Sequence, residues 1–166
     1  MIIGISGLAG SGKSSLSTEL QKITCGKVIP FAAGVKAVAL HLNWDGKKDK
    51  SGRRLLQVIG QGARDYDTDI WVKQWEHKLL AVIRSGRNIL ADDVRYPNEV
   101  AMIKEYDGVL IKVIGRGGLE GTAGGHESEQ NMDDSLFDYI VDNSGDYDTL
   151  IHKARELVQR IDKEMR

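Results

Sequence analysis

A glycine-rich segment near the start of the chain carries the residues best suited to chemistry. Residues 7–14 read Gly-Leu-Ala-Gly-Ser-Gly-Lys-Ser and match the pattern G-x-x-x-x-G-K-[ST]. In this pattern backbone N–H groups turn toward the phosphates, the lysine reaches the β- and γ-phosphates, and the last hydroxyl coordinates Mg²⁺. We therefore expect a site for ATP and Mg²⁺, formed by Gly7, Gly10, Ser11, Gly12, Lys13, Ser14 and Ser15.

The segments on either side of this loop have the periodicity that the motif requires. Residues 1–6 form a short apolar run, which predicts a strand, and residues 14–23 place apolar side chains at helical spacing. This strand, loop and helix order makes a chance match implausible. It identifies a phosphate-binding loop but not a reaction, because GTPases, ATPases and small-molecule kinases share it. The sequence contains no Asn-Lys-x-Asp guanine motif, which argues against a GTPase.

Two adjacent carboxylates follow a second buried strand, predicted over residues 88–91. The carboxyl ends of parallel strands meet the ligand crevice in an open α/β sheet, so Asp92 and Asp93 are candidates for the Mg²⁺ shell. Successive strand residues point to opposite faces, so one of the pair should approach the metal. We favour Asp93, together with Ser14; the alternative is that both carboxylates only solvate the strand end.

Candidate phosphate-binding cations lie directly after these carboxylates and also earlier in the chain. Arg95 is suited to clamp a phosphate because its guanidinium is planar and permanently charged. Glu99 either orients Arg95 or begins the next helix. Further cations, Lys36, Arg53, Arg54 and Arg64, would help to hold two anionic reactants, or would simply lie on solvated helix faces.

The rest of the chain alternates between strand and helix patterns. Helices are predicted over residues 35–42, around 55–59, over 71–83, 98–106 and 150–161, and strands over 28–31, 109–114 and 137–141. This order predicts an α/β fold in three layers, with a five-stranded parallel sheet covered by helices on both faces. Glycine-rich residues 115–125 include Arg116 and would form a small lid that excludes water, or a surface loop without a role.

Composition limits the other functions. The 166 residues are enough for one domain, and 23 basic against 24 acidic residues argue against binding of polymeric nucleic acid. The single cysteine and the lack of an apolar run of spanning length predict a cytoplasmic protein with no membrane segment. The apolar stripe over residues 71–83 leaves a homodimer open, although it suits a core equally well.

Taken together, these motifs resemble the bacteriophage-type deoxynucleoside monophosphate kinases over nearly the whole chain. The most specific part is residues 93–99, Asp-Val-Arg-Tyr-Pro-Asn-Glu. The resemblance implies one kinase domain over residues 1–166, with an acceptor-binding region at about 31–75 and a lid at about 115–127. It implies that Asn143 lies near the donor adenine. Catalytic roles would fall to Lys13, Asp93, Arg95 and Arg116, and acceptor contacts to Phe31, Lys36, Arg54, Gln57, Arg64, Trp71, Arg95 and Glu99.

Two departures from the family pattern affect the acceptor base. The chain has Ala33-Gly34 where Asp-Pro is expected, and Gln61-Gly62 where Thr-Glu is expected. The resemblance implies transfer of the γ-phosphate of ATP to a deoxynucleoside monophosphate. Two alternatives stay open, namely a kinase for dephospho-coenzyme A or another phosphorylated metabolite, and a nucleotide-binding switch that is not a kinase.

Overall fold

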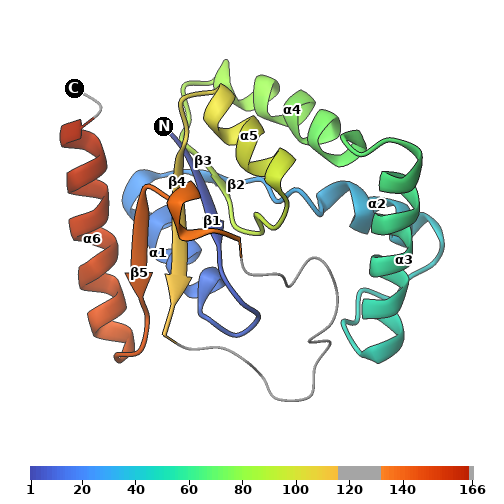
Figure 1. Cartoon of the computed structure of the whole chain (residues 1–166), viewed down its shortest axis with the longest axis horizontal. Helices are drawn as coiled ribbons and strands as arrows, with labels where there is room; N and C mark the ends of the chain where they lie inside the picture. The colour runs from blue at the N-terminus through green and yellow to red at the C-terminus, as the bar shows by residue number, and fades with distance from the viewer. Residues whose placement is uncertain (116–131, 165–166) are drawn as a thin grey trace.

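The computed structural model describes residues 1–115 and 132–164 (Figure 1). Within them, short buried strands alternate with helices as the apolar periodicity predicts. In chain order the elements are β1 (Ile2–Ser6), α1 (Lys13–Thr24), β2 (Lys27–Val28), α2 (Ala33–His41), α3 (Lys50–Tyr66), α4 (Ile70–Ile83), β3 (Ile89–Ala91), α5 (Pro97–Glu105), β4 (Val109–Ile114), a 3₁₀ turn (Asp134–Leu136), β5 (Tyr139–Asp142) and α6 (Tyr147–Glu164).

The five strands form one parallel sheet in the order β2-β3-β1-β4-β5. Gly4 of β1 pairs with Ala91 of β3, and Ser6 pairs with Lys112 of β4. The central strand is therefore β1, and the predicted phosphate-binding loop leaves it at the carboxyl edge between β3 and β4. The fold class predicted from the sequence is confirmed.

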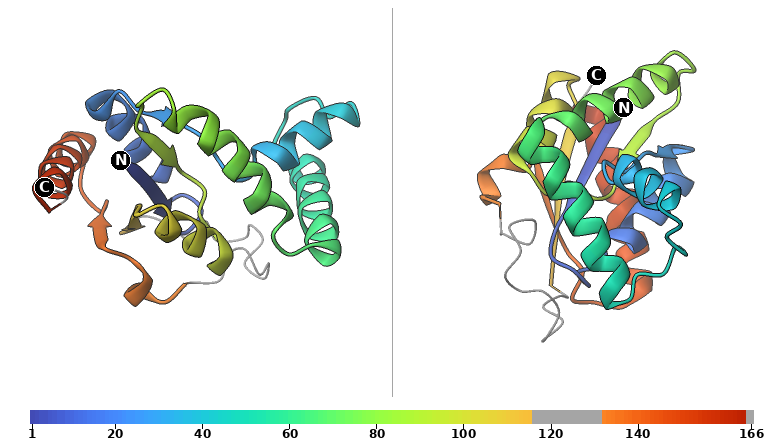
Figure 2. Two further views of the ribbon diagram at one scale, coloured as in Figure 1. Left: turned by 90° about the horizontal axis from the view of Figure 1, so that it is seen from above. Right: turned by 90° about the vertical axis from the view of Figure 1, so that its right-hand side faces the viewer.

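Helices cover both faces of the sheet and bury two apolar cores (Figures 1 and 2). One core lies beneath α4 and α5 and includes Trp75, Leu79 and Ile103. The other lies beneath α1 and α6 and includes Leu16 and Leu157. Strand residues alternate between the two cores, which explains why the central strands are apolar throughout.

Helices α2 and α3 lie beyond the sheet, on the side opposite α6 (Figures 1 and 2). Helix α3 is longer than the short helix predicted from its apolar residues. It begins within the lysine-rich residues 47–52 because Asp49 caps it, accepting a hydrogen bond from Gly52 N at 2.8 Å. The two helices occupy the region predicted to bind the acceptor.

Strand β2 is shorter than the predicted run over residues 28–31. The chain leaves the sheet after Ile29, whose N–H still donates to Leu90 O at 2.8 Å, because the next amides turn to a side chain described below. On α4, Trp71, Trp75, Leu79 and Val82 are buried. Most of the stripe is therefore core, whereas Ile83 at its end is 38% exposed, and the homodimer stays a prediction.

Other predictions fall outside the described residues or stay predictions. Arg116 and all of the proposed lid except Gly115 lie outside them. Across the described ranges, no helix is both long enough and apolar enough to cross a membrane. The single domain and the cytoplasmic location remain predictions from the sequence.

Candidate active site

The loop after β1 has the backbone that phosphate binding requires. Gly7, Gly10 and Gly12 all have positive φ, which disfavours any side chain there. Helix α1 begins at Lys13, and no side chain caps its amino terminus. The amino end of α1 directly follows the loop, and the partial positive charge of a helix end favours an anion there.

Lys13 lies folded across this loop. Its Nζ donates hydrogen bonds to Gly7 O at 2.7 Å and to Leu8 O at 2.8 Å. The ammonium is therefore held by the loop itself, where bound phosphates would compete for it. Ser14 is exposed and Ser15 is partly buried, so the Ser14 hydroxyl is open to a metal.

Asn143 contacts the loop directly. Its buried Nδ2 donates to Ser11 O at 2.9 Å, and a Cβ on Gly12 would lie 2.0 Å from this same nitrogen. The Asn143 amide therefore holds the loop backbone, and its place near the donor adenine stays a prediction. Ser11 Oγ is buried with no hydrogen-bond partner among the described residues.

The segment after β3 runs beside β1, where Val94 N donates to Ile5 O at 3.1 Å. Asp93 accepts hydrogen bonds from Phe31 N at 2.7 Å and Ala32 N at 3.0 Å. Burial raises the pKa of the Asp93 carboxyl, and these two backbone amides oppose the rise. Both oxygens of the carboxylate favoured for Mg²⁺ therefore already have partners.

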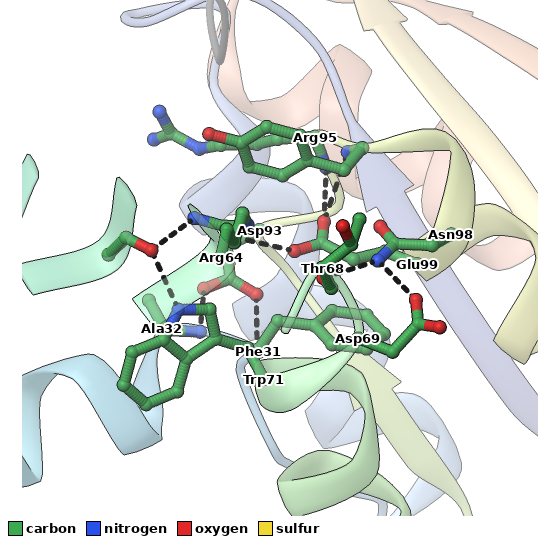
Figure 3. Close-up of polar contacts among 12 residues, drawn as sticks. Phe31, Ala32, Arg64, Thr68, Asp69, Trp71, Asp93, Arg95, Asn98 and Glu99 are labelled. Atoms are coloured by element: carbon green, nitrogen blue, oxygen red, sulfur yellow. Dashed lines mark hydrogen bonds and ion pairs between the residues drawn. The ribbon is translucent and has the colours of Figure 1, made fainter. Parts of the chain in front are cut away.

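Glu99 is 2% exposed and organises the start of α5. Its Oε2 accepts from Arg95 N at 2.7 Å and from Tyr96 N at 3.2 Å, so the carboxylate caps the helix (Figure 3). Burial raises the pKa of the Glu99 carboxyl to about 7, and the charge of Asp93 adds to the rise. Glu99 thus begins the helix, as one of its two predicted roles requires, and the same oxygen also binds the backbone N–H of Arg95.

Glu99 also reaches α3. Its Oε1 lies 3.5 Å from Arg64 Nη2, and the Arg64 guanidinium lies 3.8 Å from the centre of the Tyr96 ring. Arg64 Nη1 donates to Gly60 O at 3.3 Å. A cation stacked on a ring and paired with a carboxylate is oriented before any ligand arrives. Arg64 is therefore the best ordered of the predicted acceptor cations.

The remaining predicted acceptor residues divide into two groups. Lys36 and Gln57 are partly buried, and Arg54 and Arg95 are exposed, so these four side chains are accessible to a ligand. Phe31 and Trp71 are buried at 2% and 3% exposure. Phe31 stacks on Trp75 with ring centres 4.5 Å apart. These two aromatic side chains form the wall behind the site and present no free face to a ligand.

Trp71 packs closely against α2 and α3. Its Nε1 donates to Gly60 O at 3.0 Å, and its ring would lie 2.8 Å from a Cβ on Gly34. Only glycine lets α2 approach this ring so closely. At the second departure from the family pattern, a Cβ on Gly62 would meet nothing within 4 Å.

Tyr96 and Gly60 are site residues that sequence reasoning missed. Tyr96 lies within the 93–99 run, but its role depends on contact with α3, about 30 residues earlier in the chain. No local pattern marks such a contact. Gly60 acts through its backbone carbonyl, which carries no residue-type signal.

The donor set fits a nucleotide-bound Mg²⁺. Among the described residues, no three His, Cys, Asp or Glu side chains come together to hold a metal on their own. Mg²⁺ at phosphate sites needs only one or two protein ligands, because phosphate oxygens and water supply the rest. The Ser14 hydroxyl and a carboxylate after β3 meet that requirement.

Comparison with solved structures supports the same architecture. The chain aligns with the APS kinase of Mycobacterium tuberculosis at TM-score 0.53 and 12% identity, over 95% of this chain and 96% of that one. It aligns with a Chloroflexus aurantiacus protein assigned as a kinase at TM-score 0.51 and 12% identity, over 96% of both chains. The chain therefore shares the α/β fold of these two solved structures. No family model matches the sequence, and no curated protein matches it either.

Proposed function

We propose that this chain is an ATP-dependent phosphotransferase that phosphorylates a deoxynucleoside monophosphate. The observation that supports the proposal is that the phosphate-binding loop and a predicted acceptor cation lie beside neighbouring strands. The phosphate-binding loop follows β1, and Arg64 lies against the segment that follows the neighbouring strand β3. Two phosphorylated reactants need two anion-binding sites close together.

The reaction is an in-line displacement. An acceptor phosphate oxygen bonds to the γ-phosphorus while the bond from that phosphorus to the β–γ bridging oxygen breaks, giving ADP and a diphosphate. The acceptor phosphate is ionised near neutral pH, so no general base is needed. Lys13 would leave the loop carbonyls for the phosphates, and Arg64 and Arg95 would orient the acceptor. Mg²⁺, held by Ser14 and a carboxylate after β3, would neutralise charge on the β- and γ-phosphates.

The acceptor class rests on the sequence resemblance together with the charged and polar side chains on α2 and α3. Besides Arg64, these are the exposed Arg54 and the partly buried Gln57 on α3, and the partly buried Lys36 on α2. The packing of Gly34 beneath Trp71 and the open position at Gly62 set the shape of this region. We therefore expect the preference for the acceptor base to depend on these two positions. We also expect the acceptor to be a small molecule and not a polymeric nucleic acid.

The test is ADP release from Mg·ATP with each deoxynucleoside monophosphate, each ribose counterpart and dephospho-coenzyme A. Stimulation by one or more deoxynucleotides supports the proposal. Stimulation only by dephospho-coenzyme A or another phosphorylated metabolite would replace the acceptor. Slow ATP hydrolysis that no acceptor stimulates would favour a nucleotide switch.

Lys13→Ala provides the first prediction. Loss of the ammonium at the transferring phosphate should lower turnover by at least about 100-fold while the unfolding transition stays close to wild type. Lys27→Ala, which alters an exposed lysine on the edge strand β2, is the matched control. Wild-type turnover in Lys13→Ala would refute the assignment of the loop.

A further inference from the structure

Asp93 is bound through its side chain to the backbone of a distant segment. Its two carboxylate oxygens accept separate hydrogen bonds, at 2.7 Å from Phe31 N and 3.0 Å from Ala32 N (Figure 3). Both amides belong to the chain between β2 and α2. One side chain therefore joins the end of β3 to the beginning of the acceptor-binding region.

The sheet order shows which way this carboxylate faces. Strand β3 lies between β2 and β1, and the phosphate-binding loop follows β1. Asp93 bonds to the chain that follows β2, on the side of β3 away from that loop. Asp92 and Asp93 are both partly buried, but only Asp93 makes these two backbone hydrogen bonds, which we call the Asp93 clasp.

Removing the Asp93 carboxylate from water costs free energy, and its hydrogen bonds to the backbone offset this cost. Burying a carboxylate disfavours its charged form, and the pKa of Asp93 is raised for this reason. Two backbone N–H donors and the nearby charge of Lys36 stabilise the ionised form. The clasp should therefore keep Phe31 and Ala32 in place.

Glu99 likewise joins segments that are distant in the chain. Its carboxylate joins the backbone of Arg95 and Tyr96 to Arg64 on α3. The segment over residues 93–99 thus holds both the beginning of α2 and the end of α3. The same segment is bonded to β1 through Val94 N and Ile5 O.

We propose that Asp93 is a positioning residue that fixes the acceptor-binding region to the end of β3, and that Asp92 is the carboxylate that serves the metal. This assignment rests on the proposed function and refines it. The clasp sets the distance between the acceptor and the phosphate-binding loop. Asp93 acts through Phe31 and Ala32 and touches neither reactant.

The test compares Asp93→Asn with Asp92→Asn by two measurements, neither of which needs an acceptor. The first is hydrogen exchange at the Phe31 and Ala32 amides. The second is the increase in ADP affinity caused by Mg²⁺, measured by calorimetry. In Asp93→Asn one side-chain oxygen becomes an NH₂ group that cannot accept, so at least one amide should exchange about tenfold faster or more. The Mg²⁺ effect on ADP should persist.

Asp92→Asn should give the opposite result, with normal amide exchange and a loss of the Mg²⁺ effect on ADP affinity. Asp92→Asn that keeps the full Mg²⁺ effect would overturn the assignment, even if Asp93→Asn did not fold. Loss of the Mg²⁺ effect in Asp93→Asn with unchanged amide exchange would also overturn it.

Once an acceptor is known, a KM and kcat comparison adds a third readout. Asp93→Asn should raise the acceptor KM by about tenfold or more, with a smaller change in kcat. If no acceptor stimulates the enzyme, the proposed function fails while the exchange and ADP measurements still decide the role of Asp93.

Discussion

Replacing Glu99 with Gln should change how the stability of the protein depends on pH. Burial raises the pKa of this carboxyl from 4.5 to about 7. Between these values the folded chain keeps a proton that the unfolded chain has released, so the free energy of unfolding falls as pH rises. Each pKa unit is worth about 1.4 kcal/mol, which gives about 3 kcal/mol across the window.

Glutamine keeps a carbonyl oxygen that can accept from Arg95 N and Tyr96 N, but it cannot ionise. Urea unfolding of wild type and Glu99→Gln at several pH values from about 5 to 8 measures the difference. Relative to the variant, the wild type should lose about 3 kcal/mol of stability as pH rises. Glu105→Gln, an exposed change at the end of the same helix, is the control.

Parallel pH profiles for wild type and Glu99→Gln would refute the reasoning, because the carboxyl would then titrate alike in both states. A carbon NMR titration of the Glu99 carboxyl provides an independent reading. It should show a midpoint near 7 in the folded chain, well above the ordinary value of 4.5.

Two glycine substitutions on neighbouring helices should have opposite effects on thermal stability. Gly34→Ala places a methyl group 2.8 Å from the buried Trp71 ring, so we expect a loss of about 1–3 kcal/mol and a reduced affinity for the acceptor. Gly62→Ala meets nothing within 4 Å in the middle of α3, so it should stabilise the protein by up to about 1 kcal/mol. Calorimetric unfolding of both variants checks these signs; equal destabilisation by the two would contradict the packing argument.

Much of the fold follows from local patterns in the sequence. Alternation of short apolar runs with helical periodicity is sufficient for a parallel sheet with helices on both faces, because each element must bury its apolar side. The phosphate-binding loop is equally local, since its glycines, Lys13 and Ser14 lie within eight consecutive residues. Boundaries were less predictable. Helix α3 begins early because of the cap from Asp49, and β2 ends early because Phe31 and Ala32 turn to Asp93.

The partners of the polar side chains depended on tertiary contacts. Lys112 appears in the sequence as a cation beside the glycine-rich stretch, yet it is buried, donates to Met132 O at 3.0 Å and pairs with Asp134. Arg64 could equally have been a solvated charge, but it stacks on Tyr96 and pairs with Glu99.

The sequence alone determined the phosphate-binding loop and the order of strands and helices, because both depend on residues close together in the chain. Only the tertiary structure decided which of two adjacent carboxylates clasps the backbone. Asp92 and Asp93 are chemically identical, and their environments differ through residues about 60 positions away. A buried carboxylate must find donors, and the fold determines which donors lie within reach.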